Sequence, residues 1–581
     1  MRAWIAPVLL AMAACHSEAP PTETTAEALS PAVRINEIAD RYYEWRLATM
    51  PETAYFAAIE LERHDGIYDN SLVALQEEHA FVDGLLAEVE GVDGASLRGS
   101  PEWITYALLE RELQSLVGLR ACRNELWGVN QMGGWHLAYP QIASLQPVDT
   151  PAYRDQALSR YSKMPAMIDV EIENLRTGIE EGYSAPKAVV RRVVAQVEGL
   201  LAVPAEESPF YSLARRAEDP AFSQSVRELI EQQINPALER YRDYLANDYV
   251  EAAREVLSVT ANPNGAECYA ASLQHYTTLD RSGREVYELG QSTVAANKAS
   301  VIEMGKSVYE LSDFVEIIER AKSDPGDRFA TREALLEFSK DAVRRAEQEM
   351  PKWVGRMPEQ AAEVVPFPPH EEGTGRSAHY NPGNENRPAE YRIPLDKPED
   401  RSRGNSESTA FHEVWPGHHL QVATFQAIEG LHPVTSLIWF SGPGEGWARY
   451  SEALAEEMGL YTTVTGPILR RAWPARGMVV DPGIHLFGWT REEAIEFMME
   501  AGRFPESMGD EMVDRIAILP GQLTAYDSGG LEILALRRQA EEALGDDFDI
   551  REFHDRVLEN GTIPLGYLRQ HIEEWIAAKQ D

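Results

Sequence analysis

The sequence predicts a mainly α-helical fold, a large multi-helix domain of two lobes, and three observations support this. Through most of the 581 residues, apolar side chains recur every three to four positions among Glu, Arg and Ala, as in amphipathic helices. The alternation typical of strands is confined to residues 360–405. No internal repeat of fixed period is visible, so the chain is not a solenoid of repeated units.

Helical periodicity dominates the first 350 residues. The segments that show it are 36–62, 70–90, 101–118, 152–182, 185–204, 210–217, 220–258, 281–323 and 331–350. The segment 220–258 predicts one long helix rich in Glu and Arg, and the turn Asn262-Pro-Asn-Gly265 interrupts the helical pattern after it.

Composition changes between residues 360 and 405, where Pro, Gly, Asn and charged residues accumulate. Residues 378–380 and 390–394 predict two short strands that form a small antiparallel hairpin. An exposed edge of such a hairpin can pair with an extended peptide, or the hairpin can serve as a structural flap. Helical patterns then resume at 408–428, 445–459, 466–480, 490–500, 508–517, 522–543, 549–559 and 564–576.

The N-terminus predicts export and anchoring. Residues 1–14 combine one positive charge with a short apolar stretch, which is typical of a signal peptide and too short to span a bilayer. Ala-Ala-Cys15 resembles a bacterial lipobox, so mature Cys15 would carry lipid and 15–34 would be a flexible tether. The alternative is ordinary cleavage and a soluble periplasmic protein. Either way the protein faces the periplasm of a bacterial cell envelope, and its only expected membrane attachment is the lipid on Cys15.

The remaining 35–581 predict one helical domain, with an N-terminal lobe at about 35–360 and a second lobe at about 361–581. A net charge of −40 argues against nucleic acid or an anionic membrane surface as a partner. Cys122 and Cys268 could form a disulfide in an oxidising compartment or remain two buried thiols. The oligomeric state cannot be predicted from the sequence.

The segment His412-Glu413-Val-Trp-Pro-Gly-His418-His419 carries the strongest chemical signal in the chain. It is close to the H-E-x-x-H helix of zinc hydrolases, in which two histidines bind metal and the Glu is the general base. Pro416, however, stands where the second His of that pattern belongs. An interhelical turn that happens to contain histidines is the alternative interpretation.

Helix geometry shows what the departure requires. On an unbroken helix His418 would lie roughly 240° around the axis from His412, and His419 would lie about 10 Å further along it. Pro416 removes a helical hydrogen bond and Gly417 accepts unusual dihedral angles, so the pair can distort the helix and return a later His to His412. A two-residue bulge selects His418 and a three-residue bulge selects His419; the smaller distortion favours His418.

A third ligand is available downstream. Glu445 follows Ser-Gly-Pro-Gly and opens a helical pattern, which is where one-zinc hydrolases place their third ligand. Glu452 lies two turns later on the same face and could orient a ligand histidine through its N–H. Stabilisation of the helix N-terminus is the alternative role for Glu445.

Five sequence blocks resemble the bacterial family known as DUF 885. They are His412 to Gln421, Glu445-Gly-Trp-Ala-x-Tyr-x-Glu452, Asp481-x-Gly-x-His485, Gly521-Gln-x-Thr-x-Tyr526 and the segment from Phe553-His554 to Pro564-Leu. This family looks like a distant relative of helical metallopeptidases, including the angiotensin-converting-enzyme and thermostable-carboxypeptidase groups.

The resemblance has direct implications for the site. It implies a metallopeptidase-like fold and one zinc ion held by His, His and Glu. Glu445-Gly-Trp-Ala is similar to the Glu-Gly-Phe-Ala of zinc aminopeptidases, where the Glu is the third ligand. Tyr526 resembles a late Tyr that stabilises the transition state in those enzymes. Gly477 departs from the pattern, because relatives usually carry Arg four residues before Asp481, and here Arg476 is adjacent.

We therefore expect a zinc-dependent hydrolase that cleaves a small peptide or amide substrate, as a dipeptidase or carboxypeptidase does. Glu413 would be the general base, and Tyr526, with His485 or His554, would stabilise the oxyanion. A non-haem iron oxygenase uses the same two-His, one-carboxylate set, but it has no need of the Glu directly after His412. A peptide-binding lipoprotein with a vestigial metal site is the non-enzymatic alternative.

Several polar residues of the C-terminal third allow two interpretations. His485, predicted in a turn after Asp481, could donate to substrate or orient Glu445, with Asp481 fixing its ring. For His554 a place on the helix surface or in the core is an equal alternative. The basic residues Arg470, Arg471 and Arg476 could hold a substrate carboxylate or neutralise nearby acidic helices.

The first testable prediction concerns Cys15. Cys15→Ser should move the protein from the membrane fraction to the soluble fraction, because the substitution removes the thiol that would be lipidated. Cell fractionation followed by immunoblotting measures this. Unchanged fractionation would contradict the lipid anchor.

Overall fold

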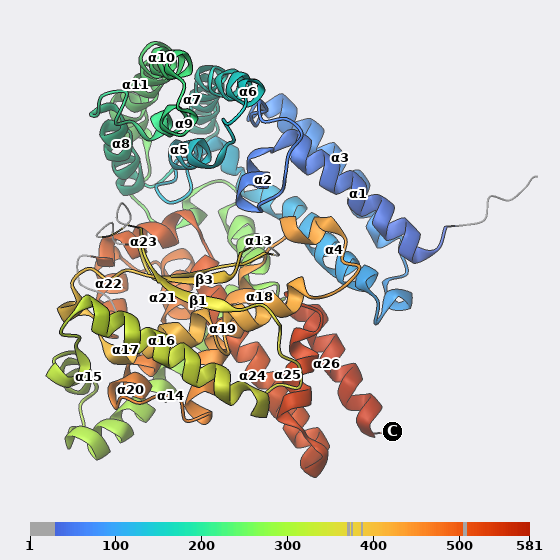
Figure 1. Cartoon of the computed structure of the whole chain (residues 1–581), viewed down its shortest axis with the longest axis vertical. Coiled ribbons are helices and arrows are strands. Elements are labelled where there is room, and N and C mark those ends of the chain that lie inside the picture. Colours follow the sequence, from blue (N-terminus) through green and yellow to red (C-terminus); the bar gives the residue numbers. More distant parts are fainter. Residues whose placement is uncertain (1–28, 369–371, 373–375, 385–386, 503–507, 581) are drawn as a thin grey trace, which may run out of the picture.

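The computed structural model describes residues 29–580 except 369–371, 373–375, 385–386 and 503–507. It confirms a mainly α fold with one small sheet (Figure 1). The predicted signal peptide, Cys15 and most of the tether lie outside the described residues. Within the described part, no helix is both long enough and apolar enough to cross a membrane.

The first half of the chain is helical as predicted, with shorter and more numerous helices. They are α1 (Pro31–Thr49), α2 (Glu52–Phe56), α3 (Leu72–Glu90), α4 (Pro101–Leu119), α5 (Trp135–Leu145), α6 (Pro151–Tyr161), α7 (Met164–Glu181), α8 (Lys187–Leu201), α9 (Ser212–Ala217), α10 (Pro220–Leu229), α11 (Asn235–Asp243), α12 (Val250–Ala252), α13 (Gly265–Thr277), α14 (Gly283–Tyr309), α15 (Phe314–Lys322) and α16 (Arg332–Glu349).

The predicted segments 152–182 and 281–323 are each two helices, α6 with α7 and α14 with α15, and three further helices differ from the sequence-based expectation. The predicted helix 36–62 ends at Thr49, because Pro51 follows closely and prevents its continuation. Helix α5 was not predicted, since it contains Pro140 in its interior. Helix α13 was also missed, because the Asn-Pro-Asn-Gly turn that breaks the pattern is itself the start of the next helix.

Side chains at the helix starts explain several of the boundaries. Ser30 accepts a hydrogen bond from the Val33 N–H at the start of α1. Ser282 and Glu285 form a reciprocal capping box at the start of α14. The predicted helix 220–258 runs as α10, α11 and α12, joined by two π-helical segments, and it ends at Ala252.

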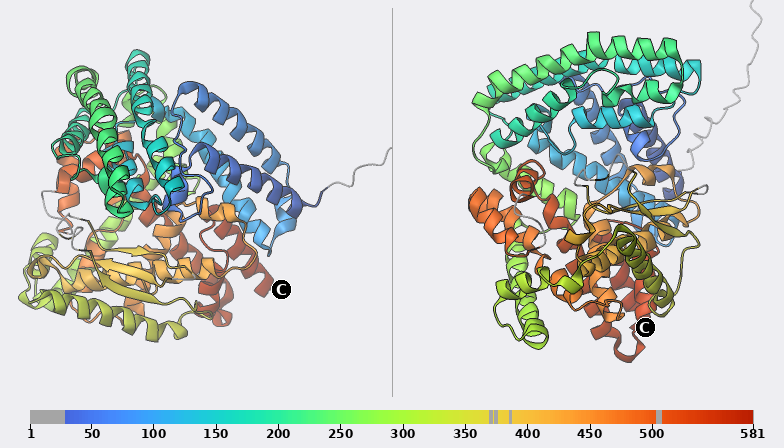
Figure 2. Two further views of the ribbon diagram at one scale, coloured as in Figure 1. Left: turned by 45° about the horizontal axis from the view of Figure 1, so that its top comes forward. Right: turned by 60° about the vertical axis from the view of Figure 1, so that its left-hand side comes forward.

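Two large hydrophobic cores organise the chain, but they do not divide at residue 360. One core lies within residues 122–273, with the addition of Ile518. The other combines α1, α3 and α4 with α16 and the C-terminal helices. The predicted lobe boundary is therefore corrected, because the first helices bury their apolar faces against the C-terminal half. Figure 2 shows the helices α6 to α11 as a separate layer over the rest of the molecule.

The sheet contains the predicted hairpin and one strand more. Its strands are β1 (Ala362–Pro366), β2 (His379–Asn381) and β3 (Ala389–Ile393), in the order β1-β3-β2. Strand β2 pairs antiparallel with β3, as expected for the hairpin, while β1 pairs parallel with β3 on its other side. Strand β2 is consequently an edge strand.

The C-terminal half carries the helices that surround the site. They are α17 (Arg403–Glu413), α18 (His418–Gln426), α19 (Ser441–Glu457), α20 (Thr465–Ala472), α21 (Arg476–Phe487), α22 (Arg491–Met499), α23 (Gly509–Ile518), α24 (Ala525–Leu544), α25 (Ile550–Leu558) and α26 (Leu565–Gln580). The predicted helix 408–428 is divided in two, and α19 starts four residues before Glu445.

Helices α19 and α24 pack backbone against backbone. A Cβ built on Gly446 would lie 2.5 Å from the Cα of Gly529, and one built on Gly529 would lie 2.0 Å from the Gly442 carbonyl oxygen. Only glycine fits at these positions, since any side chain would push the helices apart. This contact brings the start of α24 close to the middle of α19.

A disulfide joins Cys122 to Cys268, with an S–S distance of 2.09 Å. Cys122 follows the end of α4 and Cys268 lies in α13, 146 residues later. The structure therefore decides between the two alternatives that the sequence left open, in favour of pairing. A cross-link over so long a loop restricts the unfolded chain strongly.

The second testable prediction concerns this disulfide. Replacing both cysteines by Ser should lower the free energy of unfolding by about 2–5 kcal/mol, because the unfolded chain regains the freedom of the closed loop. Unfolding in denaturant with and without reductant measures it, and reductant should have no further effect on the double variant. If reductant leaves the midpoint of the wild type unchanged, the cross-link does not stabilise the fold.

Candidate metal centre

The helix that carries His412 is interrupted immediately after Glu413. Residues 414–417 are not helical, and α18 begins at His418. The Leu420 N–H donates to the Val414 carbonyl over six residues, so the turn accommodates two residues more than a regular helix does. Gly417 is required there, since a Cβ would lie 1.8 Å from the His412 carbonyl oxygen.

Side chains of α19 bind the carbonyl groups that the interruption exposes. Trp447 Nε1 donates to the carbonyls of Pro416 at 2.9 Å and Gly417 at 3.2 Å. The Ser451 hydroxyl shares its proton between the Trp447 carbonyl at 2.9 Å and the Pro416 carbonyl at 3.2 Å. The Gly417 carbonyl also accepts from the Gln421 N–H, but the Pro416 carbonyl depends on these side chains, and a buried carbonyl without a partner costs free energy. Helix α19 thus fixes the shape of the turn.

The turn brings His412 and His418 beside Glu445. Glu445 Oε2 lies 3.5 Å from Nε2 of each histidine, and one ligand atom from each residue fits within 4.8 Å of the others. Two ligands of a tetrahedral zinc ion at about 2.0–2.1 Å are about 3.4 Å apart, so the set fits zinc. The three side chains remain 11–22% exposed, which leaves the centre open to solvent.

His419 points away from this cluster. Its Nε2 lies 3.0 Å from the Gln360 carbonyl, and its Nδ1 lies 3.1 Å from the Tyr380 hydroxyl. Burial lowers the pKa of His419 to about 4, so the ring is neutral at physiological pH. Both nitrogens are engaged, and His419 therefore supports the sheet next to the site instead of completing the ligand set.

Glu452 orients His412 as the sequence predicts. Its Oε1 accepts from His412 Nδ1 at 2.9 Å, which turns Nε2 toward Glu445. Burial would lower the pKa of His412, but hydrogen bonds to Glu445 and Glu452 outweigh it and raise the pKa to about 10. Arg449 holds Glu452 through contacts of 2.8 and 2.9 Å and pairs with Asp527 at 3.0 Å. The carboxylates therefore create a position that favours positive charge.

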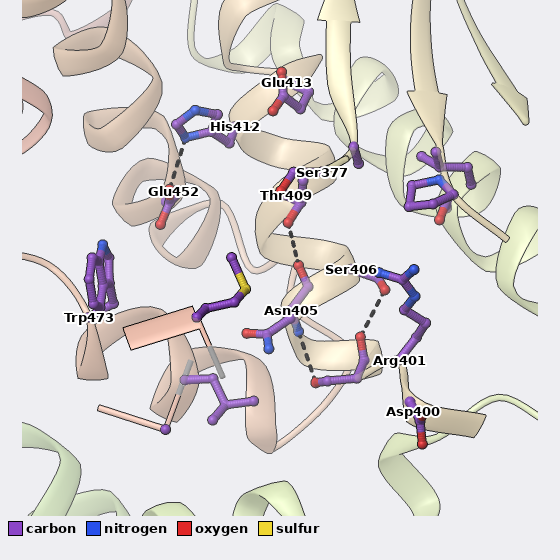
Figure 3. Close-up of a pocket in the computed structure, with 18 of the residues that line it drawn as sticks. Ser377, Asp400, Arg401, Asn405, Ser406, Thr409, His412, Glu413, Glu452 and Trp473 are labelled. Atoms are coloured by element: carbon purple, nitrogen blue, oxygen red, sulfur yellow. Dashed lines mark hydrogen bonds and ion pairs between the residues drawn. The ribbon is translucent and has the colours of Figure 1, made fainter. Parts of the chain in front are cut away.

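Glu413 lies next to His412 at the end of α17 (Figure 3). The backbone N–H of Tyr380, in edge strand β2, donates to Glu413 Oε2 at 2.9 Å. Glu413 Oε1 has no hydrogen-bond partner among the residues that the structure describes. One carboxylate oxygen is therefore held in place while the other can accept a proton.

A cavity of about 1020 Å³ reaches the site. His412, Glu413 and Glu452 lie on its wall with Tyr526 and Arg515, and Figure 3 shows the first three at one part of it. The Tyr526 hydroxyl accepts a hydrogen bond from Arg515 at 3.3 Å. The structure thus places Tyr526 on the same cavity as Glu413.

His485 is not at the site, and its predicted turn is part of helix α21. Its Nδ1 accepts from the Val259 N–H and its Nε2 donates to the Ile516 carbonyl, at 3.1 and 3.0 Å. Burial lowers its pKa to about 3. Asp481 does not fix this ring either, since it accepts from the Tyr269 hydroxyl and the Gly521 N–H. The expected substrate contact of His485 is corrected to a structural role.

His554 is also a core residue. It is fully buried, with Nε2 at 2.7 Å from the Tyr450 hydroxyl and Nδ1 at 2.7 Å from the Trp353 carbonyl. Burial lowers its pKa to about 4. The His554 ring packs against the Trp447 ring of α19 and so stabilises the position of that helix. His554 is not among the residues that line the cavity. The core alternative for His554 is the one observed.

The predicted basic cluster neutralises acidic helices instead of lining the cavity. Arg470 and Arg471 both pair with Glu456. Arg476 is fully buried and pairs with Glu500 at 3.0 Å. The substrate-carboxylate role considered for these three residues is therefore not supported by their positions.

Sequence reasoning missed four residues near the site: Arg449, Asp527, Tyr380 and Arg515. A signal existed for Arg449, because it lies on the helical face shared by Glu445 and Glu452. Asp527 directly follows Tyr526. Tyr380 contributes a backbone group, and no pattern marks Arg515, so neither could be found from the sequence.

The comparisons with known proteins agree with this architecture. A family described as "Bacterial protein of unknown function (DUF885)" matches residues 51–572, and the chain belongs to that family. No curated protein matches the chain.

Two solved structures share the fold. One is described as a "putative lipoprotein" from Colwellia psychrerythraea, with a TM-score of 0.83 and 21% identity, over 95% of this chain and 100% of that one. The other is described as a "putative lipoprotein of unknown function" from Shewanella oneidensis, with a TM-score of 0.77 and 19% identity, over 94% and 99% of the two chains. At such identities the likeness concerns the fold alone.

The third testable prediction separates the two adjacent histidines. His418→Ala should lose bound zinc, because it removes one of the three clustered ligands. His419→Ala should retain about one zinc per chain while losing stability, because it deletes a buried hydrogen-bonded ring. Metal analysis of protein purified without chelator decides it. Zinc retained by the first variant and lost by the second would reverse the assignment.

Proposed function

We propose that this protein is a zinc-dependent hydrolase of peptide or amide bonds. The observation that carries the proposal is the cluster of His412, His418 and Glu445, with the carboxylate of Glu413 adjacent to it on the wall of a large cavity. Two histidines and a glutamate with an open position are typical of one-zinc hydrolytic sites.

The residues around the cluster suit hydrolysis. A bound zinc ion would supply Lewis acidity and lower the pKa of its water to about 7. Glu413 would take a proton from the attacking water through its unbonded Oε1 and deliver it to the leaving amine. The Tyr380 N–H holds Oε2 at 2.9 Å and so limits the positions that the carboxylate can adopt.

Strand β2 supports a peptide-like substrate. It is an edge strand, and the Tyr380 N–H points away from β3 to Glu413. A substrate in extended conformation could pair along this edge, which would place its backbone beside the proposed base. Ser377 and Ala378, directly before β2, line the cavity as well. Tyr526 lies on the same wall and would stabilise the oxyanion.

An iron oxygenase would use the same ligand set, and Glu413 argues against it. An oxygenase needs open positions for oxygen and no general base beside the ligands. Here a carboxylate follows the first ligand directly, lines the cavity, and is held by a backbone N–H. A carboxylate in this position could act as the general base that removes a proton from water, as a hydrolase requires.

We also propose that the protein is anchored at the periplasmic side of a bacterial envelope through Cys15. The Ala-Ala-Cys15 sequence supports this, and the two solved structures from Colwellia psychrerythraea and Shewanella oneidensis are each described as a "putative lipoprotein". The disulfide between Cys122 and Cys268 is of the kind that persists in oxidising compartments.

The fourth testable prediction concerns Glu413. Glu413→Gln should keep bound zinc but lower kcat by at least about 100-fold on a cleaved peptide, because the amide cannot accept a proton from water. The measurement pairs metal analysis with peptide cleavage, and chelator should abolish wild-type cleavage. Glu429→Gln, at an exposed position, is the matched control and should change neither quantity. Zinc loss in Glu413→Gln equal to that of His412→Ala would make Glu413 a ligand and refute the proposed base.

A further inference from the structure

Arg515 of helix α23 lines the cavity and makes no direct contact with a carboxylate in the described part of the chain. Its Nη2 donates to the Gln522 side-chain oxygen at 2.6 Å and to the Tyr526 hydroxyl at 3.3 Å. Its Nε is buried without a hydrogen-bond partner in the described part of the chain. Within those residues, no acidic group lies close enough to form an ion pair with it.

The chain has 94 acidic and 54 basic residues, so acidic partners are abundant. Two other arginines of the same cavity have them: Arg449 pairs with Glu452 and Asp527, and Arg401 pairs with Asp396. Arg328, on the same cavity, also forms no ion pair in the described part of the chain, but it donates to the backbone carbonyls of Asp400 and Lys322. A partly buried guanidinium with unused donors is costly unless it has another use.

We infer that Arg515 binds the terminal carboxylate of the substrate. This inference rests on the proposed hydrolytic function and gives it a substrate class, namely peptides with a free C-terminus. A hydrogen bond from a guanidinium N–H to a carboxylate is charge-assisted and therefore strong. Arg515 lines the cavity, donates through Nη2 to two neutral groups, and keeps the N–H groups of Nη1 for an anion.

The contact with Tyr526 sets the register of the substrate. If the Tyr526 hydroxyl stabilises the oxyanion at the scissile carbonyl, then Arg515, at 3.3 Å from that hydroxyl, lies about one residue away. One residue of extended chain spans about 3.3–3.6 Å. A substrate whose last peptide carbonyl lies at Tyr526 can therefore reach Arg515 with the carboxylate of the residue that directly follows, and we assign this register.

This register defines the reaction. Water adds its oxygen to the last peptide carbonyl, the C–N bond breaks, and a proton taken up by Glu413 passes to the leaving amine. The products are a peptide shortened by one residue and a single free amino acid. The structure thus favours a carboxy-terminal exopeptidase, which includes the cleavage of N-blocked dipeptides.

The fifth testable prediction uses N-acetylated trialanine and its C-terminal carboxamide as probes. Wild type should release free alanine from the acid and cleave the amide at least about 10-fold less efficiently. Arg515→Ala should raise KM for the acid about 10- to 100-fold and abolish the preference, because it removes the charge-assisted bonds. Arg515→Lys should recover part of it, since the charge remains.

Two controls separate a specific anchor from general effects. Arg401→Ala removes a positive charge from the same cavity and should keep the preference for the acid. Zinc content and the thermal unfolding midpoint should be the same in wild type and Arg515→Ala, which excludes misfolding. If Arg515→Ala lowers kcat equally for acid and amide, Arg515 acts only through Tyr526 and the inference is wrong.

A binding measurement makes the result independent of turnover. Zinc-loaded Glu413→Gln should bind acetyl-trialanine more tightly than its amide by calorimetry, and the difference should vanish in the Glu413→Gln, Arg515→Ala double variant. A carboxylate preference without any cleavage by wild type would retain the anchor and refute the hydrolase. Equal binding of both probes, or binding of neither, would refute the anchor.

Discussion

The hydrogen bonds from Trp447 and Ser451 to the turn at residues 414–417 are the constraint on which the site depends. An interrupted helix exposes carbonyl groups, and in a buried region they need donors. Because α19 supplies these donors, the turn can hold two extra residues and return His418 to His412. The same helix carries Glu445 and Glu452, so one element stabilises the turn, provides one of the proposed ligands and orients another through Glu452.

A second constraint fixes α19 itself. Its glycines pack against those of α24, at distances that leave no room for a Cβ. This contact places Asp527 within 3.0 Å of Arg449, and Arg449 in turn holds Glu452 against His412. The position of His412, a proposed ligand, therefore depends on the packing of α19 against α24, through the contacts of Asp527 with Arg449, Arg449 with Glu452 and Glu452 with His412. Substitution of these glycines would disturb the site without touching a ligand.

The features of the fold and the site that depend on the spacing of nearby residues could be predicted from the sequence. Helical periodicity predicted the mainly helical fold and the grouping of Glu445 with Glu452. Strand periodicity predicted the β2–β3 hairpin. The preference for His418 followed from the smaller distortion that it requires of the helix after Glu413. What depends on tertiary burial was not predictable. His485 and His554 resemble site residues in sequence but lie in the core, and the first helices share a core with the C-terminal half. Arg515 belongs to no pattern, and only the structure shows that it lies beside Tyr526 on the cavity.

Zinc-edge anomalous diffraction from crystals grown with zinc tests the central claim most directly. The account predicts one strong peak per chain, about 2.0–2.2 Å from His412 Nε2, His418 Nε2 and a Glu445 oxygen. His419 should remain bonded to the Gln360 carbonyl, and Glu413 should lie outside the coordination sphere. A peak ligated by His419 or Glu413, or no peak at this cluster under saturating zinc, would contradict the account.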